Sequence, residues 1–122
     1  ACIIFILTAC QSIGKESDQV NYTTITMDEA KEIFAESDEY IILDVRTNAE
    51  FEEGHIPGAI CIPNEIIGES EIEQLPDKDV IIYVYCRSGN RSKQAAEKLV
   101  KLGYTNIIEV GGIMDWDGEV EK

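Results

Sequence analysis

The sequence predicts an α/β domain built on a mostly parallel sheet. Apolar, β-branched runs alternate along the chain with segments of helical periodicity, which is the pattern of successive strand–helix–strand units. Two runs, residues 40–45 and 80–85, are nearly free of charge, as expected of strands that are buried on both faces. In open parallel sheets, ligands bind at the carboxyl ends of the strands. The loops after Val45 and Tyr85 are therefore expected to converge at one rim and to form the site.

Five segments are strand candidates because they are short and rich in β-branched and aromatic residues. They are residues 22–26, 40–45, 59–62, 80–85 and 104–110. Helical spacing and capping patterns predict helices over residues 27–36, 47–54 and 91–102, one or two short helices within 64–75, and a last one that begins at 113–116. The glycine pair 111–112, between the last strand and the last helix, is interpreted as a turn.

Local motifs predict where the helices begin and end. Thr26 and Glu29 form a capping-box pattern at the start of the first helix. Thr47 and Glu50 repeat this pattern at the start of the second. Gly103 follows the long helix as a C-terminal stop.

Length and charge limit the function classes. The chain has 122 residues, enough for one domain with a single hydrophobic core. Its 10 basic and 24 acidic residues give a net charge of −14, which argues against nucleic acid or an anionic membrane surface as a partner. Arg87 and Arg91, on either side of a loop that starts at Cys86, are a local exception to this acidic composition.

The first 21 residues are expected to lie outside the domain, which would span residues 22–122. Residues 1–9 are apolar but fall short of the ~20 residues of a membrane-spanning helix, and they are typical of the end of a secretory signal. The segment that ends at Cys10 resembles a bacterial lipoprotein signal box, with Cys10 as the lipidated residue, and residues 11–21 have the composition of a flexible tether. We therefore expect a signal-peptide remnant and an exported, membrane-anchored protein that faces the periplasm or the cell exterior. The alternatives are a buried N-terminal strand or a cloning remnant, in a cytoplasmic protein.

Cys86 is the candidate nucleophile. It directly follows the strand at 80–85, and a helix begins soon after it, so that it faces the positive end of a helix dipole. Arg87 and Arg91 add two guanidinium groups, and Gly89 lets the loop turn inward without a Cβ clash. These neighbours favour the reactive thiolate, which is typical of partly exposed, electropositive positions. The alternative is an inert structural cysteine at the end of a core strand.

Two further residues invite a functional interpretation. His55 could act as a base toward the cysteine, but its Pro/Gly turn favours a structural histidine that bonds loop carbonyls. Cys61 lies in a short apolar strand and is most simply a core residue. A disulfide between Cys61 and Cys86 would require Cα atoms within about 7 Å of each other.

Three blocks of sequence lie within roughly residues 22–116. They are LDVR with EF, GHIPGA and IP between residues 43 and 63, YCRSGNRS at 85–92, and GY at 103–104 with VGG at 110–112 and Trp116. This combination resembles the rhodanese family, specifically its single-domain bacterial sulfurtransferases. The resemblance implies a three-layer domain in which helices flank a central, mostly parallel five-stranded sheet. Cys61 stands where relatives often carry Asn.

The resemblance also implies a mechanism. Cys86 would take a sulfur atom from a donor such as thiosulfate, and a thiophilic acceptor, cyanide or a thiol, would remove it from the resulting persulfide. Arg87 would attract an anionic donor, Arg91 would support the loop, and Asp44 and Arg46 would order the rim beside it. The implied substrate-binding residues are Arg87, Ser88, Gly89, Asn90, Arg91 and Ser92. The resemblance implies no cofactor or metal, and we expect a monomer.

Two other functions are compatible with similar residues. Cdc25-like phosphatases and arsenate reductases resemble this pattern, but they place one more residue between cysteine and arginine than the four that separate Cys86 from Arg91. The shorter loop suits a terminal sulfur better than a tetrahedral phosphate. A non-catalytic binding module is disfavoured because Cys86, Gly89 and both arginines are present.

Overall fold

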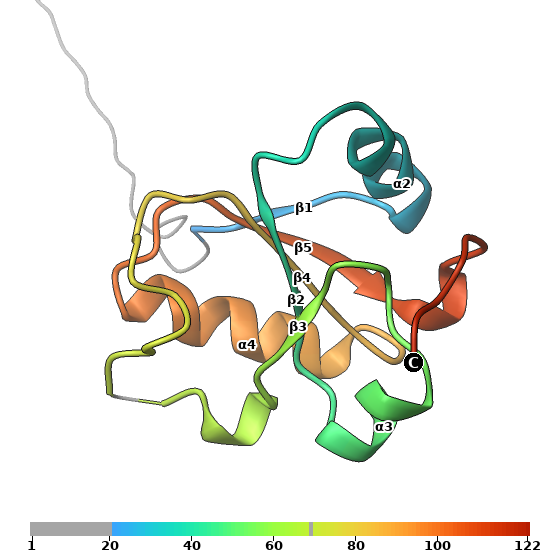
Figure 1. Cartoon of the computed structure of the whole chain (residues 1–122). Coiled ribbons are helices and arrows are strands. Elements are labelled where there is room, and N and C mark those ends of the chain that lie inside the picture. Colours follow the sequence, from blue (N-terminus) through green and yellow to red (C-terminus); the bar gives the residue numbers. More distant parts are fainter. Residues whose placement is uncertain (1–20, 69) are drawn as a thin grey trace, which may run out of the picture.

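A five-stranded parallel sheet forms the centre of the computed structural model, which describes residues 21–68 and 70–122 (Figure 1). The strand order is β1-β5-β4-β2-β3, and each strand runs parallel to its neighbours. The predicted α/β class is therefore confirmed. The predicted signal remnant, with Cys10, and nearly all of the predicted tether lie outside the described residues.

The elements alternate as the sequence pattern predicts. The strands are β1 (Thr23–Thr24), β2 (Ile41–Asp44), β3 (Ile60–Cys61), β4 (Ile82–Cys86) and β5 (Ile107–Gly112). The helices are α2 (Met27–Glu36), α3 (Asn48–Glu53) and α4 (Asn90–Lys101), with 3-10 turns η4 (Asn64–Ile66) and η5 (Ile113–Asp115). Both predicted capping boxes are present, at Thr26 of α2 and at Thr47 of α3.

The sheet is covered on both faces, which gives three layers. Figure 1 shows α2 on one side of the sheet and α4 on the other. Side chains of β4 alternate between the two resulting cores: Ile82, Val84 and Cys86 join the core under α4, and Tyr83 and Tyr85 join the core under α2. Burial on both faces explains why this strand carries no charge.

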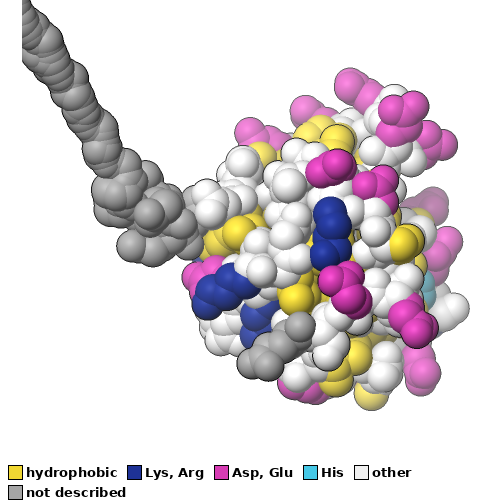
Figure 2. Space-filling model, turned by 90° about the vertical axis from the view of Figure 1, so that its left-hand side faces the viewer, with side chains coloured by type: hydrophobic (Ala, Val, Ile, Leu, Met, Phe, Trp, Pro, Cys, Tyr) yellow, Lys and Arg dark blue, Asp and Glu magenta, His cyan; other side chains and the backbone are white. Residues whose placement is uncertain are grey.

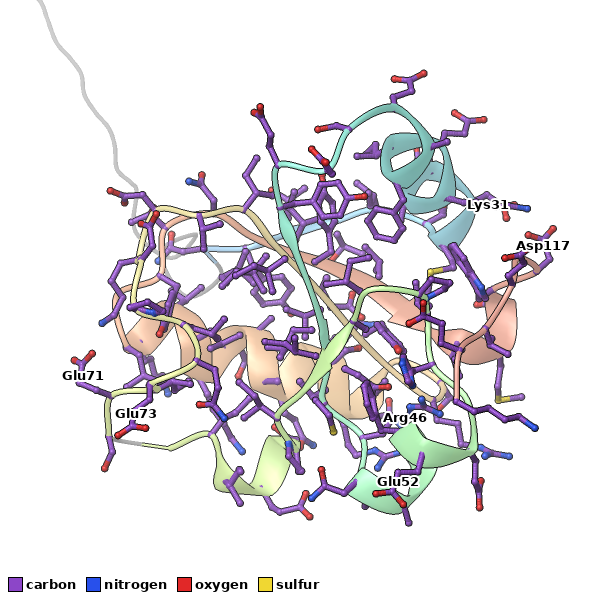
Figure 3. All side chains as sticks on the ribbon, viewed as in Figure 1. Lys31, Arg46, Glu52, Glu71, Glu73 and Asp117 are labelled. Atoms are coloured by element: carbon purple, nitrogen blue, oxygen red, sulfur yellow. The ribbon has the colours of Figure 1, made fainter. Side chains whose placement is uncertain are left out.

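The C-terminal segment returns to the α2 side of the sheet. Figure 3 shows Lys31 of α2 beside Asp117, and the Lys31 Nζ and Asp117 Oδ1 atoms are 2.8 Å apart. Among the described residues, no helix has the length and the apolar character needed to cross a membrane.

The predicted turn at Gly111 and Gly112 is wrong, because both residues belong to β5. Gly112 pairs with Cys86, and a shift in register between Val84 and Cys86 makes room for Gly111, whose φ of 87° lies in the left-handed region. A Cβ atom at Gly112 would collide with the carbonyl oxygen of Arg87. Glycine is needed here for close backbone approach and not for chain reversal.

The segment 64–75 contains a single 3-10 turn, η4, among its described residues. Its apolar side chains nevertheless reach the core, since Ile67 and Leu75 are buried and Ile72 packs against the α4-side cluster. The spacing that predicted short helices thus reflects burial along an irregular segment.

Candidate active site

Cys86 is the last residue of β4, and a tight loop connects it to α4. Gly89 is the N-cap of α4, with a φ of 113°, and no side chain caps this helix. The loop folds back so that the Gly89 N–H donates to Cys86 Sγ over 3.0 Å. The sulfur therefore lies at a helix N-terminus, where unpaired amides and the helix dipole favour an anion.

Cys86 is more deeply buried than expected. Its exposed fraction is 1%, so the predicted partly exposed position is wrong. The reason is the close contact between the loop and the end of β5. Met114 N–H donates to the Arg87 carbonyl oxygen over 3.2 Å, and Gly112 lies directly beneath that carbonyl. Three loop residues, Arg87, Ser88 and Asn90, are exposed above the buried sulfur.

Ser92, in the first turn of α4, points its hydroxyl toward the same sulfur. Ser92 Oγ lies 3.5 Å from Cys86 Sγ and 3.0 Å from the Gly89 carbonyl oxygen. The residue is fully buried. The sequence placed Ser92 among the loop residues, and the structure brings its side chain to the candidate nucleophile.

Glu109 of β5 is a buried carboxylate that the sequence reasoning missed. Its exposed fraction is 0%, and its Oε2 atom accepts from Ser92 Oγ at 2.5 Å and from Gly111 N–H at 2.9 Å. Lys93 Nζ lies 3.7 Å from the other oxygen. A single charged residue inside the strand candidate at 104–110 was the available signal, because buried carboxylates need partners.

Arg91 links the loop to α3 by a bidentate ion pair. Its Nη1 and Nη2 atoms donate to Glu50 Oε1 and Oε2 over 2.8 and 3.1 Å. The hydrogen bonds from Arg91 lower the pKa of Glu50 to about 2. The sequence identified Glu50 only as a capping residue, and the same carboxylate also accepts from the Thr47 backbone.

Asp44 and Arg46 (Arg46 is labelled in Figure 3) form a buried ion pair at the end of β2, with Arg46 Nη2 2.6 Å from Asp44 Oδ2. Arg46 also donates to the Gly54 carbonyl oxygen over 2.7 Å. Tyr85 Oη donates to Asp44 over 2.8 Å and accepts from Ile56 N–H over 3.1 Å, and burial together with the Asp44 charge raises the pKa of Tyr85. This network ties β2 and β4 to the turn after α3.

The structure separates His55 and Cys61 from the loop chemistry. His55 Nδ1 bonds the Phe51 carbonyl oxygen at 2.9 Å, and its ring stacks on Phe51, as the turn sequence favoured. Cys61 lies on β3, and β2 separates it from β4. Two strand spacings come to about 10 Å, which exceeds the reach of a disulfide. Burial raises the pKa of the Cys61 thiol to about 11.

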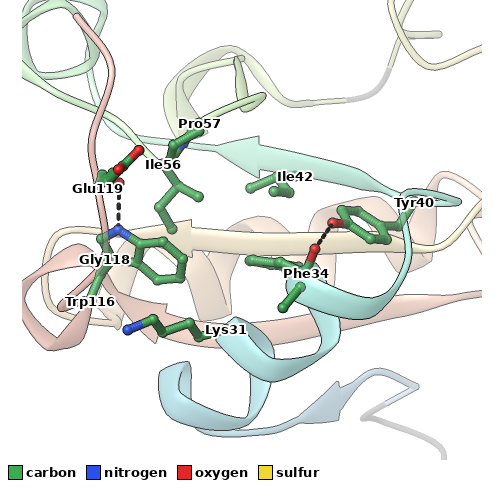
Figure 4. A pocket seen from close by; sticks show the side chains of 10 residues that line it. Lys31, Phe34, Tyr40, Ile42, Ile56, Pro57, Trp116, Gly118 and Glu119 are labelled. Atoms are coloured by element: carbon green, nitrogen blue, oxygen red, sulfur yellow. Dashed lines mark hydrogen bonds between the residues drawn. The ribbon is translucent and has the colours of Figure 1, made fainter.

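A separate cavity of about 320 Å³ lies on the α2 side of the sheet (Figure 4). Phe34, Tyr40 and Trp116 are among its lining residues, whereas no residue of the loop from Cys86 to Ser92 lines it. Trp116 packs near Phe34, and its indole N–H donates to the Glu119 carbonyl oxygen over 2.8 Å. This cavity opens on the opposite face of the sheet from the core that contains Cys86.

Acidic residues outnumber basic ones in this chain, and Arg87 and Arg91 lie at the Cys86 loop. Figure 2 shows acidic side chains around the rim of one face and basic side chains in only a few places. Within residues 21–68 and 70–122, no three His, Cys, Asp or Glu side chains are grouped so that they could bind a metal ion together. The loop of Cys86 combines a thiol, a free helix N-terminus and two arginines, and this arrangement can stabilise a nucleophilic or anionic sulfur.

Comparison with known proteins gives one family. The model of the rhodanese-like domain matches residues 26–119. Among curated relatives, thiosulfate sulfurtransferase PspE of Escherichia coli is 38% identical over 73 residues, which cover 60% of this chain and 70% of that protein. A sulfurtransferase of Allochromatium vinosum is 40% identical, over 67% of this chain and 76% of the relative. Other relatives are longer: the match spans 46% of the putative sulfur carrier protein YrkF of Bacillus subtilis, with 43% identity over 70% of this chain.

Solved structures agree with this match. A rhodanese-like domain protein from Staphylococcus aureus has a TM-score of 0.70 and 34% identity, over 81% of this chain and 96% of that one. A rhodanese with anions from E. coli has a TM-score of 0.62 and 35% identity, over 68% of this chain and 98% of that one. The fold and the sequence thus lead to the same family.

Proposed function

The chain belongs to the rhodanese-like domain family, and on this premise we propose that it is a sulfurtransferase that carries a sulfane sulfur as a persulfide on Cys86. Relatives named as sulfurtransferases support sulfur transfer as the reaction class. One observation supports the assignment of the persulfide to Cys86. Cys86 Sγ accepts the Gly89 N–H over 3.0 Å at the N-terminus of α4, which is the position at which the chain best stabilises a sulfur anion.

The proposed reaction proceeds in two half-reactions. The Cys86 thiolate attacks the outer sulfur of thiosulfate; the S–S bond of thiosulfate breaks, and sulfite leaves with the electron pair. Cyanide or a thiolate then attacks the outer sulfur of the persulfide. The S–S bond to Cys86 breaks, the acceptor leaves as thiocyanate or a persulfide, and the Cys86 thiolate is regenerated.

The loop is suited to both anions in this cycle. Arg87 is exposed, so its guanidinium group can attract an anionic donor. The solved E. coli relative is described as a rhodanese with anions, which fits a donor of this charge. The buried amide of Gly89 then faces the sulfur that receives the transferred atom.

Burial of Cys86 sets a further requirement. With an exposed fraction of 1%, the sulfur is reached only when the loop from Arg87 to Asn90 opens. The loop is held against η5 by the Met114–Arg87 backbone bond, whereas Arg91 at its end remains fixed to Glu50. We expect opening to involve the exposed part of the loop and to leave the ion pair intact.

Phosphatase chemistry receives less support from the same geometry. A phosphatase of this type needs an arginine that is free to bind two oxygens of a phosphate. Arg91 already uses both terminal nitrogens on Glu50. Together with the short spacing from Cys86, this favours a ligand with a single terminal sulfur.

Mass spectrometry of the intact protein tests the proposal. Incubation with thiosulfate is expected to add one sulfur atom, and later addition of cyanide is expected to remove it and release thiocyanate. The Cys86→Ser variant should gain no sulfur, whereas the matched control Cys61→Ser should behave like the wild type. Absence of the added sulfur across a panel of sulfane donors, or its retention in Cys86→Ser, would overturn the assignment.

A further inference from the structure

Three side chains from three elements form a buried hydrogen-bond chain. Cys86 ends β4, Ser92 lies in the first turn of α4, and Glu109 lies in β5. Cys86 Sγ is 3.5 Å from Ser92 Oγ, and Ser92 Oγ is 2.5 Å from Glu109 Oε2. All three residues have exposed fractions of 1% or less. The Ser92 hydroxyl therefore lies between the thiol and the carboxylate and contacts both directly.

The direction of this chain follows from the single proton of a hydroxyl group. Ser92 Oγ has three acceptors within reach: Glu109 Oε2 at 2.5 Å, the Gly89 carbonyl oxygen at 3.0 Å and the Gly111 carbonyl oxygen at 3.4 Å. The carboxylate is the nearest and the only charged one of the three, so Ser92 donates to it, and the Ser92 oxygen is left to accept from the Cys86 thiol. If Glu109 gains a proton, the chain can reverse. Glu109 then donates to Ser92, and Ser92 donates to a Cys86 thiolate. Both directions satisfy every member of the chain.

We propose that Glu109 is a positioning residue that accepts the Cys86 proton through Ser92. The S–H bond of Cys86 breaks as its proton passes to Ser92 Oγ, the original Ser92 proton passes to Glu109 Oε2, and the electron pair of the S–H bond stays on sulfur. The products are a thiolate and a neutral carboxylic acid. No proton leaves the site, and no other reactant is required.

Charge burial supports this exchange. A thiolate and a carboxylate in the same buried site would repel each other without solvent screening. The proposed transfer keeps one negative charge in both states and only moves it from oxygen to sulfur. Under this proposal, one proton is shared between Cys86 and Glu109 through Ser92.

Other ionisable groups face this pair from the neighbouring elements. Lys93 Nζ is the nearest cation to Glu109, at 3.7 Å, and it favours the ionised carboxylate. Arg91 interacts with Cys86 electrostatically and favours the thiolate. Tyr22, in the segment before β1, interacts electrostatically with Glu109. Asp28 of α2 and Asp115 of η5 line the same cavity as Glu109 and Lys93. Lys93 thus lies beside Glu109, and Arg91 interacts with Cys86.

In turnover, this role depends on the proposed function. Glu109 would hold the thiol proton while the Cys86 thiolate attacks the donor sulfur, and it would return the proton when the acceptor has left. The protonation equilibrium itself can be measured without any sulfur donor. Failure of sulfur transfer and failure of the Glu109 proposal are therefore distinguishable.

The test is a pH titration of the thiolate by its ultraviolet absorbance, using the full chain minus its Cys86→Ser counterpart. A shared proton predicts that the wild-type thiolate signal rises in two separate steps, because the second negative charge forms only at higher pH. Glu109→Gln should give one step, and the matched control Glu97→Gln, on the exposed side of α4, should keep two. A single step in the wild type would overturn the proposal, even if the Glu109 variant does not fold.

The rate of Cys86 alkylation by iodoacetamide gives a second measurement. We expect the alkylation rate of the wild type to show a pH-independent plateau between the two titration steps. In Glu109→Gln, the rate should instead fall tenfold for each unit by which the pH decreases over the same range. Ser92→Ala should lower the plateau by about tenfold, since it removes the hydroxyl that donates to the thiolate, and Ser92→Thr should restore it. Equal slopes in the wild type and Glu109→Gln would contradict the proposal.

Discussion

At the scale of single residues, Glu50 serves two structures at once. Its Oε1 atom accepts from the Thr47 backbone and hydroxyl, which caps α3, and both of its oxygens bind Arg91. The hydrogen bonds from Arg91 are the main reason that the pKa of Glu50 falls to about 2. The carboxylate therefore connects the stability of a short helix to the position of the loop after Cys86.

The Glu50–Arg91 pair makes stability depend on pH. The pKa of Glu50 is lowered from 4.5 to about 2 in the folded protein, so its stabilisation is complete above pH 4.5 and is lost as the pH falls toward 2. We expect Glu50→Gln to lower the free energy of unfolding by roughly 1 kcal/mol at about pH 7, with a smaller difference from the wild type near pH 3. Urea denaturation at both pH values measures this.

Glu52→Gln is the matched control for that measurement, because Glu52 is exposed on the same helix (Figure 3). It should change stability little at either pH. If Glu50→Gln and Glu52→Gln give the same pH dependence, the pair with Arg91 contributes nothing specific.

At the scale of elements, the helix starts fall into two kinds. α2 and α3 both begin with a complete capping box, whereas α4 has Gly89 as its N-cap and no side-chain cap. A side-chain cap would occupy the N–H groups that an anion needs. The uncapped start of α4 leaves the Gly89 N–H to the Cys86 sulfur. The start of α4 thus provides a backbone donor to the Cys86 sulfur.

The two capping boxes allow a matched comparison of elements. Thr26→Ala and Thr47→Ala each remove one cap and should each cost about 1 kcal/mol of stability. Only α3 is connected to the loop, through Glu50, and with six residues it is too short to be stable without its neighbours. We therefore expect Thr47→Ala, but not Thr26→Ala, to slow alkylation or sulfur loading of Cys86, by several-fold. Equal rates in the two variants, at equal stability, would show that α3 does not position the loop.

At the scale of the whole molecule, two electrostatic effects oppose each other. The net charge of −14 repels an anionic reagent over long range, and the exposed Arg87 attracts it close to the sulfur. Salt screens charges that are farther apart than the Debye length, which is about 10 Å at 0.1 M. Screening therefore weakens the distant repulsion more than the local attraction.

This difference predicts the salt dependence of Cys86 modification. When ionic strength rises from about 0.01 M to about 0.15 M, the rate with anionic iodoacetate should increase relative to the rate with neutral iodoacetamide. Arg87→Gln should lower this ratio at every ionic strength, whereas Lys31→Gln, the same charge change on α2, should not. A ratio that falls with added salt would mean that the loop charges dominate at all distances.

Much of the fold could be predicted from the sequence. The α/β class, the strand candidates and both capping boxes depend on periodicity and on motifs a few residues long, and the structure contains all of them. The glycine pair at 111–112 was misinterpreted because local sequence does not distinguish a glycine that turns the chain from one that admits a neighbouring backbone. The close approach of Arg87 is a property of the packed loop.

The sequence by itself determined the class of fold, the family and the loop that contains Cys86, because these are written in residues that are adjacent or regularly spaced. Only the tertiary structure decided that Cys86 is buried and which groups surround it. The partners are distant along the chain: Ser92 and Glu109 are 17 residues apart, and Glu50 and Arg91 are 41 apart. Such contacts arise when parallel strands and the helices between them pack, and no local pattern specifies which polar side chains then meet in the interior.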